Sequence, residues 1–492
     1  MTTSGGRRPH DRFRALFEPR GIVVAGAAAH PGKFGFVAFH NLRACGYAGS
    51  LYGTNLAGEE VLGEPTYRSL AEVPDADLDL VFLAVPPTAT AEVLRQAADR
   101  GITAAFCASA GYGEVDEQGR ATQDDLAALA DDLGILFVGP NGQGLVSTPN
   151  SMCAQIVAPM PPAGPIGIAS QSGGFVSTFG NLARHSGVGV SRGVSVGNSA
   201  QVGVADLMEF YVDDPATTVG LAYLEHIDPD TVARLGAVTD RLPVVVMRGG
   251  RSPAGVRSVA AHTGSTAGPD TTDDELRDAG VTVVATIAEA FRTAATFATQ
   301  PLPRGPRTVV FGTAGGWGVV TADAVEHSEL ELLPLPDDLM AEIAARVPPR
   351  WSRRNPIDLA GGETRDTVPE LLPILAAHPD VDAIVYLGLG IQSNQAALAR
   401  AGGFFPDHGL DRIVAYHERQ DARFAEAATL ASEASGIPVI SATELAVTNP
   451  DNPGPATVRA GGRFCHGAGD EAVAALDHLW RLARHRGATP ER

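Results

Sequence analysis

The chain has few cysteines and no long apolar run, and these absences limit the class of protein to which it can belong. Its 492 residues include four cysteines, and none of them stands in a C-x-x-C pair. Because Cys45, Cys107, Cys153 and Cys465 lie far apart along the chain, their spacing predicts neither a zinc site nor a disulfide framework. No apolar run approaches the ~20 residues that cross a bilayer, and residues 1–20 lack the apolar centre of a signal peptide. These absences predict a cytoplasmic protein without membrane contact.

Basic side chains are also scarce. The chain has 37 Lys and Arg residues against 57 Asp and Glu residues, a formal net charge of -20. Phosphate backbones attract basic surfaces, so this balance argues against a nucleic-acid partner. It leaves small anionic ligands open, because a few local groups can hold them. With 44% hydrophobic residues the chain can bury sizeable cores, and its length predicts about three domains.

Short apolar runs alternate with helical periods from Gly21 onward. Strands are expected at 22–25, 51–54, 80–85, 103–107 and 135–138, with helices such as 34–45 between them. Strands that alternate with helices of this length predict βαβ units and a parallel sheet. We expect this first domain to cover residues 10–157.

Two proline-rich linkers, 158–165 and 301–306, introduce a second and a third alternating block. Both blocks open with a strand, a loop of small residues that ends in Gly-Gly, and a helix, which indicates an internal repeat. We expect domains at 165–299 and 306–487. In the third, Arg412–Ala415 is expected to be a strand, and residues 449–468, rich in Pro, Gly and Asn, are expected to be an insertion or a mobile loop.

The loop from Gly26 to Gly35 is a candidate phosphate site at the end of the first strand. It lacks the G-x-G-x-x-G pattern of dinucleotide-binding folds. It also misses the P-loop pattern, since one residue too many separates Gly26 from Gly32, and Phe34 stands where a magnesium-binding Ser or Thr belongs. A small-residue turn with Lys33 at a helix start suits another phosphate-bearing nucleotide. The alternative is a tight turn with a solvated lysine.

A second anion site is indicated where the second block begins. The stretch from Ser170 to Gly174 opens a helix directly after a strand, and the free N–H groups of a helix start attract anions. It does not fit G-x-S-x-G, so Ser172 is not expected to be a hydrolase nucleophile. Simple capping of the helix by Ser172 is the alternative.

An acid and a histidine complete the candidate site. Glu225 ends an apolar strand, where a carboxylate is costly unless it is paired or lies at a site. Such a carboxylate can accept a hydrogen bond from one ring nitrogen of a histidine and leave the other nucleophilic. His262 lies in the small-residue stretch Ser258–Gly268, which we expect to be a loop, downstream of the Gly/Arg-rich run Arg248–Arg251. The alternative is a turn with an incidental surface histidine.

These motifs together resemble the α-subunit portion of NDP-forming (ADP-forming) acyl-CoA synthetases, relatives of succinyl-CoA synthetase. The resemblance covers about residues 12–445. In chain order the matching stretches are Gly26 to Gly35, Asn55, Val85-Pro86, Gly111 to Glu114, Gly139 to Gly144, Ser170 to Gly173, Gly197-Asn198, Tyr223 to Glu225, Gly250 to Ser252, His262 to Gly264, Thr313 to Gly316 and Asn355 to Asp358.

The resemblance implies an α/β fold: an N-terminal Rossmann-like CoA-binding domain followed by two flavodoxin-like (succinyl-CoA synthetase-like) parallel-sheet domains. It also implies residue roles. His262 would become phosphorylated and Glu225 would hold it. Phosphate would be received by Ser170, Gln171, Ser172, Gly173, Gly174, Thr263 and Gly264. CoA would lie near Gly26, Lys33, Gly35, Asn55, Val85, Pro86, Pro140 and Asn141. The acyl group would lie near Asn198 and Trp317, and no metal ligand is expected on this chain.

The implied reaction turns acyl-CoA and phosphate into acyl phosphate, then phospho-His262, then ATP from ADP, or runs in reverse from a carboxylic acid. The sequence departs from the family at Ala27-Ala28, where a serine is usual, and at Arg248, where a lysine is usual. It also shows no room for an ATP-grasp domain after residue 445. ATP or ADP and Mg²⁺ are therefore expected on a separate ATP-grasp β subunit, and an oligomer is expected.

Two other functions stay open. A CoA- or acyl-CoA-binding regulator would keep the scaffold without the ligase reaction. An acyl-CoA transferase would use Glu225 as acyl acceptor and need neither phosphate nor nucleotide. The sequence does not name the acid.

Overall fold

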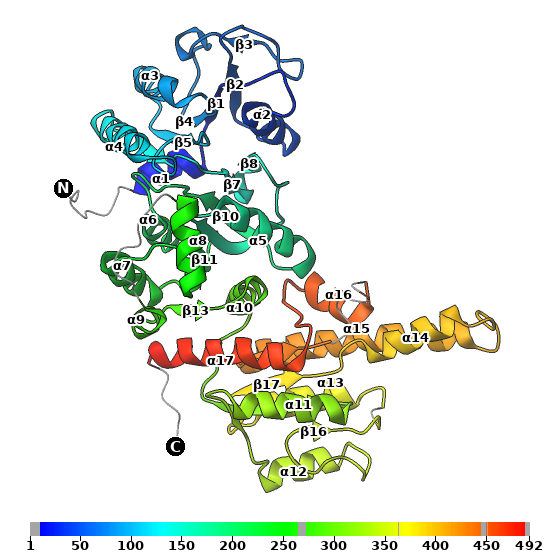
Figure 1. The fold of residues 1–492 in the computed structure, drawn as a ribbon. Helices are drawn as coiled ribbons and strands as arrows, with labels where there is room; N and C mark the ends of the chain where they lie inside the picture. Colours follow the sequence, from blue (N-terminus) through cyan, green and yellow to red (C-terminus); the bar gives the residue numbers. More distant parts are fainter. Residues whose placement is uncertain (1–9, 264–271, 363, 444–448, 450, 488–492) are drawn as a thin grey trace. The chain divides into compact units, whose positions relative to one another are not determined.

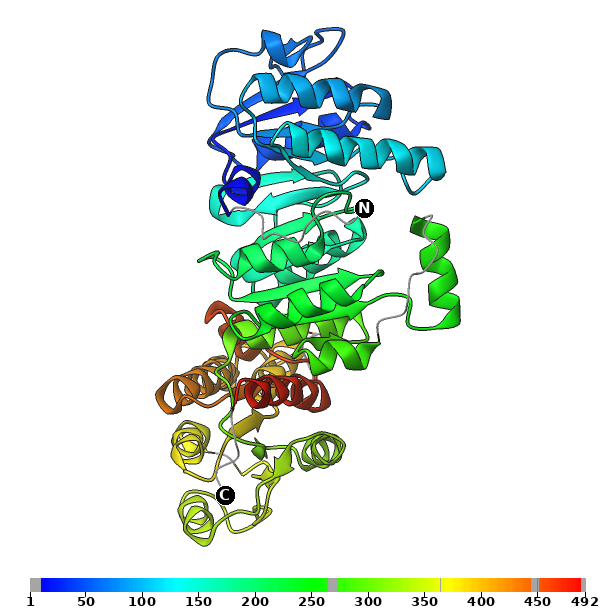
Figure 2. The same ribbon diagram turned by 90° about the vertical axis from the view of Figure 1, so that its left-hand side faces the viewer.

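The computed structural model describes residues 10–263, 272–362, 364–443, 449 and 451–487 (Figure 1, Figure 2). Contacts divide the chain into two units. The first contains Met1–His185 and Gly189–Ala290, and the second contains Ser186–Val188 and Phe291–Arg492. The first two expected domains thus fall largely in one unit and the third in the other.

Six parallel strands form the first sheet, in the spatial order β3-β2-β1-β4-β5-β6. This is the strand order of the Rossmann fold, whose ligand crevice lies between β1 and β4 at the carboxyl edge. The strands are β1 (Gly21–Ala25), β2 (Ser50–Thr54), β3 (Thr66–Tyr67), β4 (Leu80–Leu83), β5 (Ala104–Cys107) and β6 (Leu136–Val138). The helices are α1 (His10–Phe17), α2 (Phe34–Ala44), the 3₁₀ turn η1 (Leu70–Glu72), α3 (Pro87–Asp99) and α4 (Glu117–Asp132).

Both faces of this sheet are covered, which explains why its strands are apolar without alternation. Ile22 and Val24 belong to the same core cluster as Phe39 of α2. Val23 and Ala25 belong to the cluster that contains the buried leucines of α3 and α4. Figure 1 shows α2 on one side of the sheet and α3 and α4 on the other.

The second sheet has the order β13-β12-β11-β9-β10-β7-β8. Its parallel strands β9 to β13 follow the flavodoxin order 2-1-3-4-5, so its ligand crevice is expected between β9 and β11. The strands are β7 (Gly144–Ser147), β8 (Met152–Gln155), β9 (Ala163–Ser170), β10 (Val190–Ser195), β11 (Val219–Leu224), β12 (Val244–Arg248) and β13 (Thr282–Val284). The helices are η2 (Thr148–Asn150), α5 (Gly173–Ser186), α6 (Val204–Tyr211), α7 (Pro229–Thr239), α8 (Pro253–Thr263), α9 (Asp273–Asp278) and α10 (Ile287–Thr299).

The expected boundary at residue 157 does not coincide with the boundary between the sheets. β7 and β8 precede it, yet β7 pairs antiparallel with β10 and β8 pairs with β7. One core also joins the two sheets, because the ring of Phe17 in α1 stacks at 5.2 Å on Phe210 of α6. Pairing between segments distant in the chain leaves no local signal, which is why the sequence did not reveal it.

The second unit contains a five-stranded parallel sheet, β15-β14-β17-β18, with β16 paired to β14. The strands are β14 (Arg307–Gly312), β15 (Glu331–Leu332), β16 (Ile357–Asp358), β17 (Ala383–Tyr386) and β18 (Val439–Ser441). The helices are α11 (Gly315–Glu326), α12 (Asp337–Ala344), α13 (Thr367–Ala377), α14 (Ile391–Ala401), α15 (Leu410–Ser435), α16 (Pro453–Ala460) and α17 (Gly469–His485). The α/β fold class with parallel-sheet domains is thus confirmed.

Two expectations for this unit were wrong. Arg412–Ala415 is not a strand but part of α15, whose 26 residues end at Gly436 in the left-handed conformation (φ 72°). Figure 1 shows α14 and α15 running out together beyond the sheet. The stretch 449–468 contains α16, and His466 pairs with Ala442 as a bridge beside β18. In the part of the chain that the structure describes, no helix is long and apolar enough to cross a membrane.

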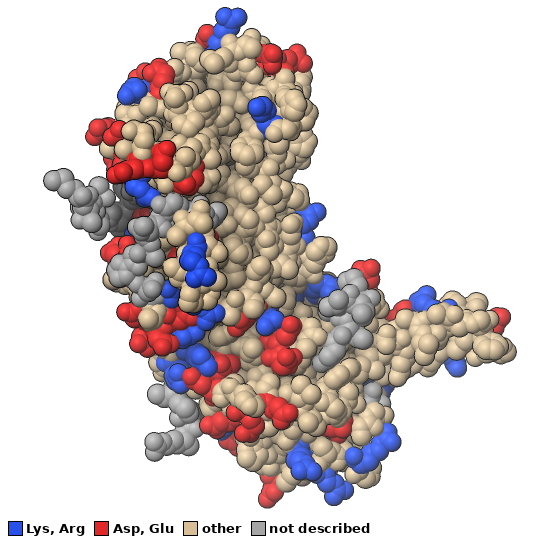
Figure 3. Space-filling view, in the orientation of Figure 1, with Lys and Arg blue, Asp and Glu red and all other residues tan. Residues whose placement is uncertain are grey.

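Acidic and basic side chains are interspersed on the face drawn in Figure 3. Many of them form ion pairs on the surface. Arg241 contacts Asp213 at 2.6 Å, and Arg277 contacts Asp274 at 2.7 Å. Such pairs distribute the acidic excess over the surface but contribute little stability each, because water and salt screen them.

Arg192 is a charged residue in the core of the first unit. It lies in β10 with 1% of its surface exposed. Its guanidinium donates to Asp214 at 3.1 Å, to Glu18 at 2.7 Å and to the hydroxyl of Ser147. The group also lies over the ring of Phe17, 5.5 Å from its centroid. Arg192 therefore joins α1, β7 and the second sheet through a single buried charge.

We expect Arg192→Met to lower the free energy of unfolding of the first unit by about 3–5 kcal/mol, because it leaves the buried carboxylate of Asp214 without its cation. Urea denaturation followed by circular dichroism measures the change. Arg241→Met, which breaks an exposed pair, is the matched control and should cost less than about 1 kcal/mol. Equal losses in the two variants would show that burial does not set the strength of the Arg192 pair.

Candidate functional site

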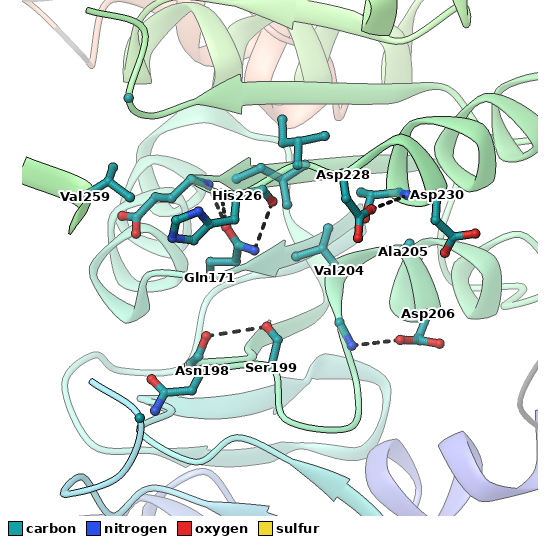
Figure 4. A pocket seen from close by; sticks show the side chains of 18 of the residues that line it. Gln171, Asn198, Ser199, Val204, Ala205, Asp206, His226, Asp228, Asp230 and Val259 are labelled. Carbon is teal, nitrogen blue, oxygen red and sulfur yellow. Dashed lines mark hydrogen bonds between the residues drawn. The ribbon is translucent and has the colours of Figure 1, made fainter. Parts of the chain in front are cut away.

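A pocket of about 530 Å³ lies in the first unit, at the carboxyl ends of the strands of both sheets (Figure 4). Loops that follow six different strands contribute to its wall, and so do α6, α7 and α8. The contributions after the strands are Gly113 after β5, Asn141 after β6, Gln171 after β9, Asn198 after β10, Glu225 after β11 and Gly250 after β12. Ligands of open parallel sheets bind at this edge.

The residues expected to contact CoA all lie at the carboxyl edge of the first sheet. They follow β1, β2, β4 and β6: Gly26, Lys33, Gly35, Asn55, Val85, Pro86, Pro140 and Asn141. Lys33 is exposed and occupies the N-cap position of α2, as the sequence predicted. Of these eight, Asn141 also lines the 530 Å³ pocket.

The loop between β1 and α2 is shaped by two glycines and one amide. Gly26 has φ 88°, a conformation that favours glycine. A Cβ on Gly35 would lie 2.0 Å from the carbonyl oxygen of Gly26, so only glycine fits there. Asn55 donates from Nδ2 to the carbonyl of Ala27 at 2.9 Å and accepts at Oδ1 from the N–H of Ala57. Asn55 thus holds the loop in place from the end of β2.

The stretch Ser170–Gly174 leads from β9 into α5, which begins at Gly173. The buried Ser170 hydroxyl donates to the carbonyl of Ser172 at 2.6 Å and accepts from its N–H at 3.1 Å. A Cβ on Gly173 would lie 2.3 Å from Cβ of Gln143. Ser170 therefore fixes the turn, and the positive end of the 14-residue helix α5 faces this loop.

The side chain of Gln171 holds the end of β11. Its Oε1 accepts the N–H groups of Glu225 at 2.6 Å and His226 at 3.1 Å, and its Nε2 donates to the carbonyl of His226 at 3.3 Å (Figure 4). The N–H of Gln171 itself donates to the carbonyl of Tyr223 at 3.2 Å. These groups are hydrogen-bonded within the protein, and the phosphate contact expected of Gln171 stays a prediction.

Glu225 is half-buried at the end of β11. Its Oε1 accepts from the hydroxyl of Tyr223 at 2.9 Å. The ring of Tyr223 stacks at 3.9 Å on Phe175, in the first turn of α5, and burial together with the Glu225 charge raises the pKa of Tyr223. A Cβ on Gly249 would come within 2.4 Å of the Tyr223 hydroxyl, so a glycine there makes room for this arrangement.

Arg248 ends β12 and lines the pocket. One terminal nitrogen contacts Asp273 at 3.1 Å, and Arg251 contacts the same carboxylate at 2.7 Å. The Nε of Arg248 is buried and has no hydrogen-bond partner among the residues that the structure describes. A buried N–H without a partner is costly, so this guanidinium is suited to an anion that enters the pocket.

The expectation of a loop at Ser258–Gly268 was wrong for its first part. Residues up to Thr263 belong to α8, so His262 lies in the last turn of a helix. The structure describes only the backbone of His262 and Thr263, and Gly264 lies outside the described residues. Two signals for the helix were present in the sequence. Pro253 follows Ser252, a pair typical of a helix start, and Val256, Val259 and Ala260 repeat at helical spacing.

Helix α8 has an unusual surface. None of its residues from 253 to 261 is buried, although Val256 and Val259 are half-covered and line the pocket. Gly250, three positions before the helix, has φ 70°. The helix that ends near His262 therefore contributes to the pocket wall through two valines alone among its described side chains.

Asn198 lines the pocket, but its carboxamide is hydrogen-bonded to other side chains of the protein. Its Nδ2 donates to Glu114 at 2.6 Å and to Gln123 at 2.9 Å, and its Oδ1 accepts from Asn141 at 3.3 Å. Burial raises the pKa of Glu114, but hydrogen bonds from the Gly111 N–H and from Asn198 outweigh it, so the net pKa is lowered. This network shapes the wall between the two sheets. Trp317 belongs to α11 in the second unit and is not among the residues that line this pocket.

Several pocket residues were not predicted from the sequence. His226 follows Glu225 directly and lines the pocket (Figure 4), and so do Arg120, Gln123 and Asp206. Their position on helices and loops that converge only in the folded chain left no local pattern. Among the described residues, no group of three or more His, Cys, Asp or Glu side chains is placed to hold a metal ion.

Family models match each part of the chain. A CoA binding domain matches residues 20–190, a succinyl-CoA ligase like flavodoxin domain matches 163–297, and a ligase-CoA domain matches 308–393. The first two matches overlap over residues 163–190, which contain β9 and α5.

Relatives extend this match over most of the chain. The α subunit of an ADP-forming acetate–CoA ligase I from Pyrococcus furiosus is 33% identical over 384 residues, which cover 76% of this chain and 82% of that protein. An ADP-forming acetate–CoA ligase I from Archaeoglobus fulgidus is 30% identical, with 75% of this chain and 54% of that longer protein covered.

A solved structure shares the whole fold. It is an acetyl-coenzyme A synthetase 1 from Ca. Korarchaeum cryptofilum in complex with phosphate and ADP, with a TM-score of 0.82 and 26% sequence identity, and the match covers 97% of this chain and 98% of that one. The resemblance seen in the sequence is thereby confirmed: the chain belongs to the family of ADP-forming acyl-CoA synthetases, acid–thiol ligases, as an α-type chain.

Proposed function

We propose that this chain binds CoA at the carboxyl edge of its first sheet and carries phosphate on His262. One observation carries the proposal: the start of α5 and the carboxylate of Glu225 meet at the crevice between β9 and β11. The pocket beside them is partly walled by α8, the helix in which His262 lies. Phosphate transfer from an acyl phosphate to a histidine requires the phosphate, the acyl group and the histidine to meet at one site.

The chemistry assigns a role to each group. Acyl-CoA and phosphate exchange to give acyl phosphate and CoA, and His262 then takes the phosphoryl group and releases the acid. Glu225 accepts a hydrogen bond from one ring nitrogen of His262, which leaves the other nitrogen nucleophilic. The positive end of α5 and the guanidinium of Arg248, whose Nε has no partner in the described part of the chain, offset the charge of the phosphate. Thr263 and Gly264 remain proposed phosphate contacts.

The final transfer, from phospho-His262 to ADP, requires a nucleotide site. We propose that an ATP-grasp β subunit supplies it together with Mg²⁺, so that the active protein is an oligomer of at least two chains. In support, the aligned part of the chain spans about half, 54%, of the longer relative from Archaeoglobus fulgidus. We assign no particular carboxylic acid as the substrate. The hydrogen bonds of Asn198 indicate that it shapes the pocket wall. Asn198 and Trp317 remain proposed contacts of the acyl group.

Phosphorylation tests the assignment of His262. The purified chain is mixed with an ATP-grasp β subunit and with ATP labelled at the γ position. We expect acid-labile label on the wild-type chain and less than about 1% of it on His262→Ala. Glu225→Gln should slow labelling by roughly 10²-fold, as expected when an orienting carboxylate is lost.

His226→Asn is the matched control, because it removes the other imidazole near Glu225 and should keep the label. Label that disappears with His226→Asn but not with His262→Ala would overturn the assignment. If CoA binds but no variant or wild-type chain takes label, the chain is a CoA-binding regulator. If acyl groups pass between two acids without phosphate, it is a transferase.

CoA binding tests the first loop. Gly35→Ala places a methyl group 2.0 Å from the carbonyl oxygen of Gly26, so the loop must open and Lys33 must move. We expect at least a tenfold loss of CoA affinity by isothermal titration calorimetry, about 1.4 kcal/mol. Gly32→Ala, in the same loop, meets nothing closer than the His30 ring at 3.1 Å and should bind within about threefold of wild type. Equal affinities in the two variants would place CoA elsewhere.

Hydrogen exchange tests whether Gln171 positions Glu225. Gln171→Met removes the acceptor of two backbone N–H groups, each hydrogen bond being worth about 1 kcal/mol. We therefore expect the amides of Glu225 and His226 to exchange about tenfold faster or more. Gln201→Met is the control, because Gln201 accepts the N–H of Phe137 at 2.7 Å and should leave Glu225 unchanged. If the amides of Glu225 and His226 stay protected from exchange in Gln171→Met, the hydrogen bonds of Gln171 do not hold the end of β11.

A further inference from the structure

Two cysteines that stand 108 positions apart meet in the first unit. Cys45 is the C-cap residue of α2, and Cys153 lies in β8. α2 packs against β8, and the two are tied by Asn41, whose Nδ2 donates to the carbonyl of Gln155 at 2.6 Å. The sequence predicted no pairing between these residues because their spacing alone gives no reason for it.

The geometry of the two elements brings the thiols together. Cys45 lies four residues beyond Asn41, about 6 Å along the same helix face. Cys153 lies two residues before Gln155, about 6.6 Å along the strand. The bond between Asn41 and Gln155 thus sets the register at which one thiol meets the other, and their side chains are hydrogen-bonded to each other.

The two thiols differ in accessibility. Cys153 is fully buried, and its sulfur also contacts the carbonyl of Ala158 at 3.9 Å. Cys45 is only half-buried and lies at the end of its helix. A small oxidant can therefore reach Cys45 first and Cys153 only through it.

The surroundings of Cys45 favour its thiolate. The hydrogen bond from Cys153 is the largest cause, burial opposes it, and the N–H of Met160 and the charge of His40 assist, which together lower the pKa of Cys45 to about 7. Burial raises the pKa of Cys107 to about 12, so that thiol stays protonated. Thiolates are the nucleophilic form of cysteine, and this contrast selects Cys45.

We propose that Cys45 and Cys153 form a dithiol site that reacts with hydroperoxides and closes to a reversible disulfide. The Cys45 thiolate attacks one peroxide oxygen, the O–O bond breaks, and Cys45 sulfenic acid and hydroxide result. The Cys153 sulfur then attacks the Cys45 sulfur, the S–O bond breaks and water leaves as the disulfide forms. Two electrons pass from the two sulfurs to the peroxide: two thiols and H₂O₂ give one disulfide and two waters.

The site lies away from the pocket, at the opposite end of α2 from the loop to which the proposed function assigns CoA. Helix α2 starts at Phe34, directly after Lys33, and ends at the dithiol. A disulfide would join its last turn covalently to β8, a strand of the other sheet of the same unit. The inference does not depend on the ligase reaction, because it concerns thiols that take no part in it.

The experiment exposes the purified full chain to hydrogen peroxide at pH 7 and follows it by mass spectrometry. We expect a loss of 2 Da, a peptide pair linked through Cys45 and Cys153 without reductant, and recovery of both thiols with dithiothreitol. Hydrogen exchange in the last turn of α2 should slow at least about threefold in the oxidised form. Unchanged thiols, or oxidation of Cys45 to sulfinic acid with Cys153 intact, would overturn the proposal.

Variants assign the order of events. Cys153→Ser should stop at the sulfenic acid of Cys45, which dimedone traps, and Cys45→Ser should lose peroxide reactivity by at least tenfold. Cys465→Ala is the matched control and should form the disulfide as wild type does. If Cys153→Ser fails to fold, Cys45→Ser still decides, because a linked peptide or an unchanged peroxide rate in that variant contradicts the assignment.

Discussion

The side chain of Gln171 makes the connection on which the candidate site depends. It follows β9, and it holds the backbone of Glu225 and His226 after β11 through three hydrogen bonds of 2.6 to 3.3 Å. The end of one strand is thereby fixed against the end of its neighbour. Because α5 starts two residues after Gln171, the same clamp sets the distance between a helix N-terminus and a carboxylate. Tyr223 adds a second link, since its hydroxyl holds Glu225 while its ring stacks on Phe175 of α5.

Parallel strand order explains why these groups meet at all. All carboxyl ends of a parallel sheet lie on one edge, and a crevice opens where the chain reverses direction across the sheet. The second sheet places β9 and β11 at that position, so the Ser170–Gly174 turn and Glu225 face each other. The first sheet brings the residues expected to bind CoA to its own carboxyl edge by the same rule. Since one core joins the two sheets, a single pocket can reach from Asn141 to Arg248.

Several features of the site were open to prediction. The strands of the first two sheets that precede functional loops are buried apolar runs, and the helix at Lys33 begins where the sequence predicted. The ordered motifs resembled one family, and the comparisons confirmed it. The helix at Pro253–Thr263 was missed because its small residues suggested a loop, although Ser252-Pro253 and the valine spacing carried the signal. The hydrogen bonds of the Gln171 side chain to the end of β11 were not predicted, because side-chain hydrogen bonds across strands leave no trace in residue order.

The sequence by itself determined the elements and the family, because hydrophobic periodicity, glycine positions and motif order are local properties of the chain. Only the tertiary structure decided which of them meet. It brought β7 and β8 into the second sheet, set Arg192 against Asp214, engaged the amides of Gln171 and Asn198, and joined Cys45 to Cys153. Each of these depends on hydrogen bonds or packing between segments separated by tens of residues. Their energies come from burial and geometry in three dimensions, which no local stretch of sequence contains.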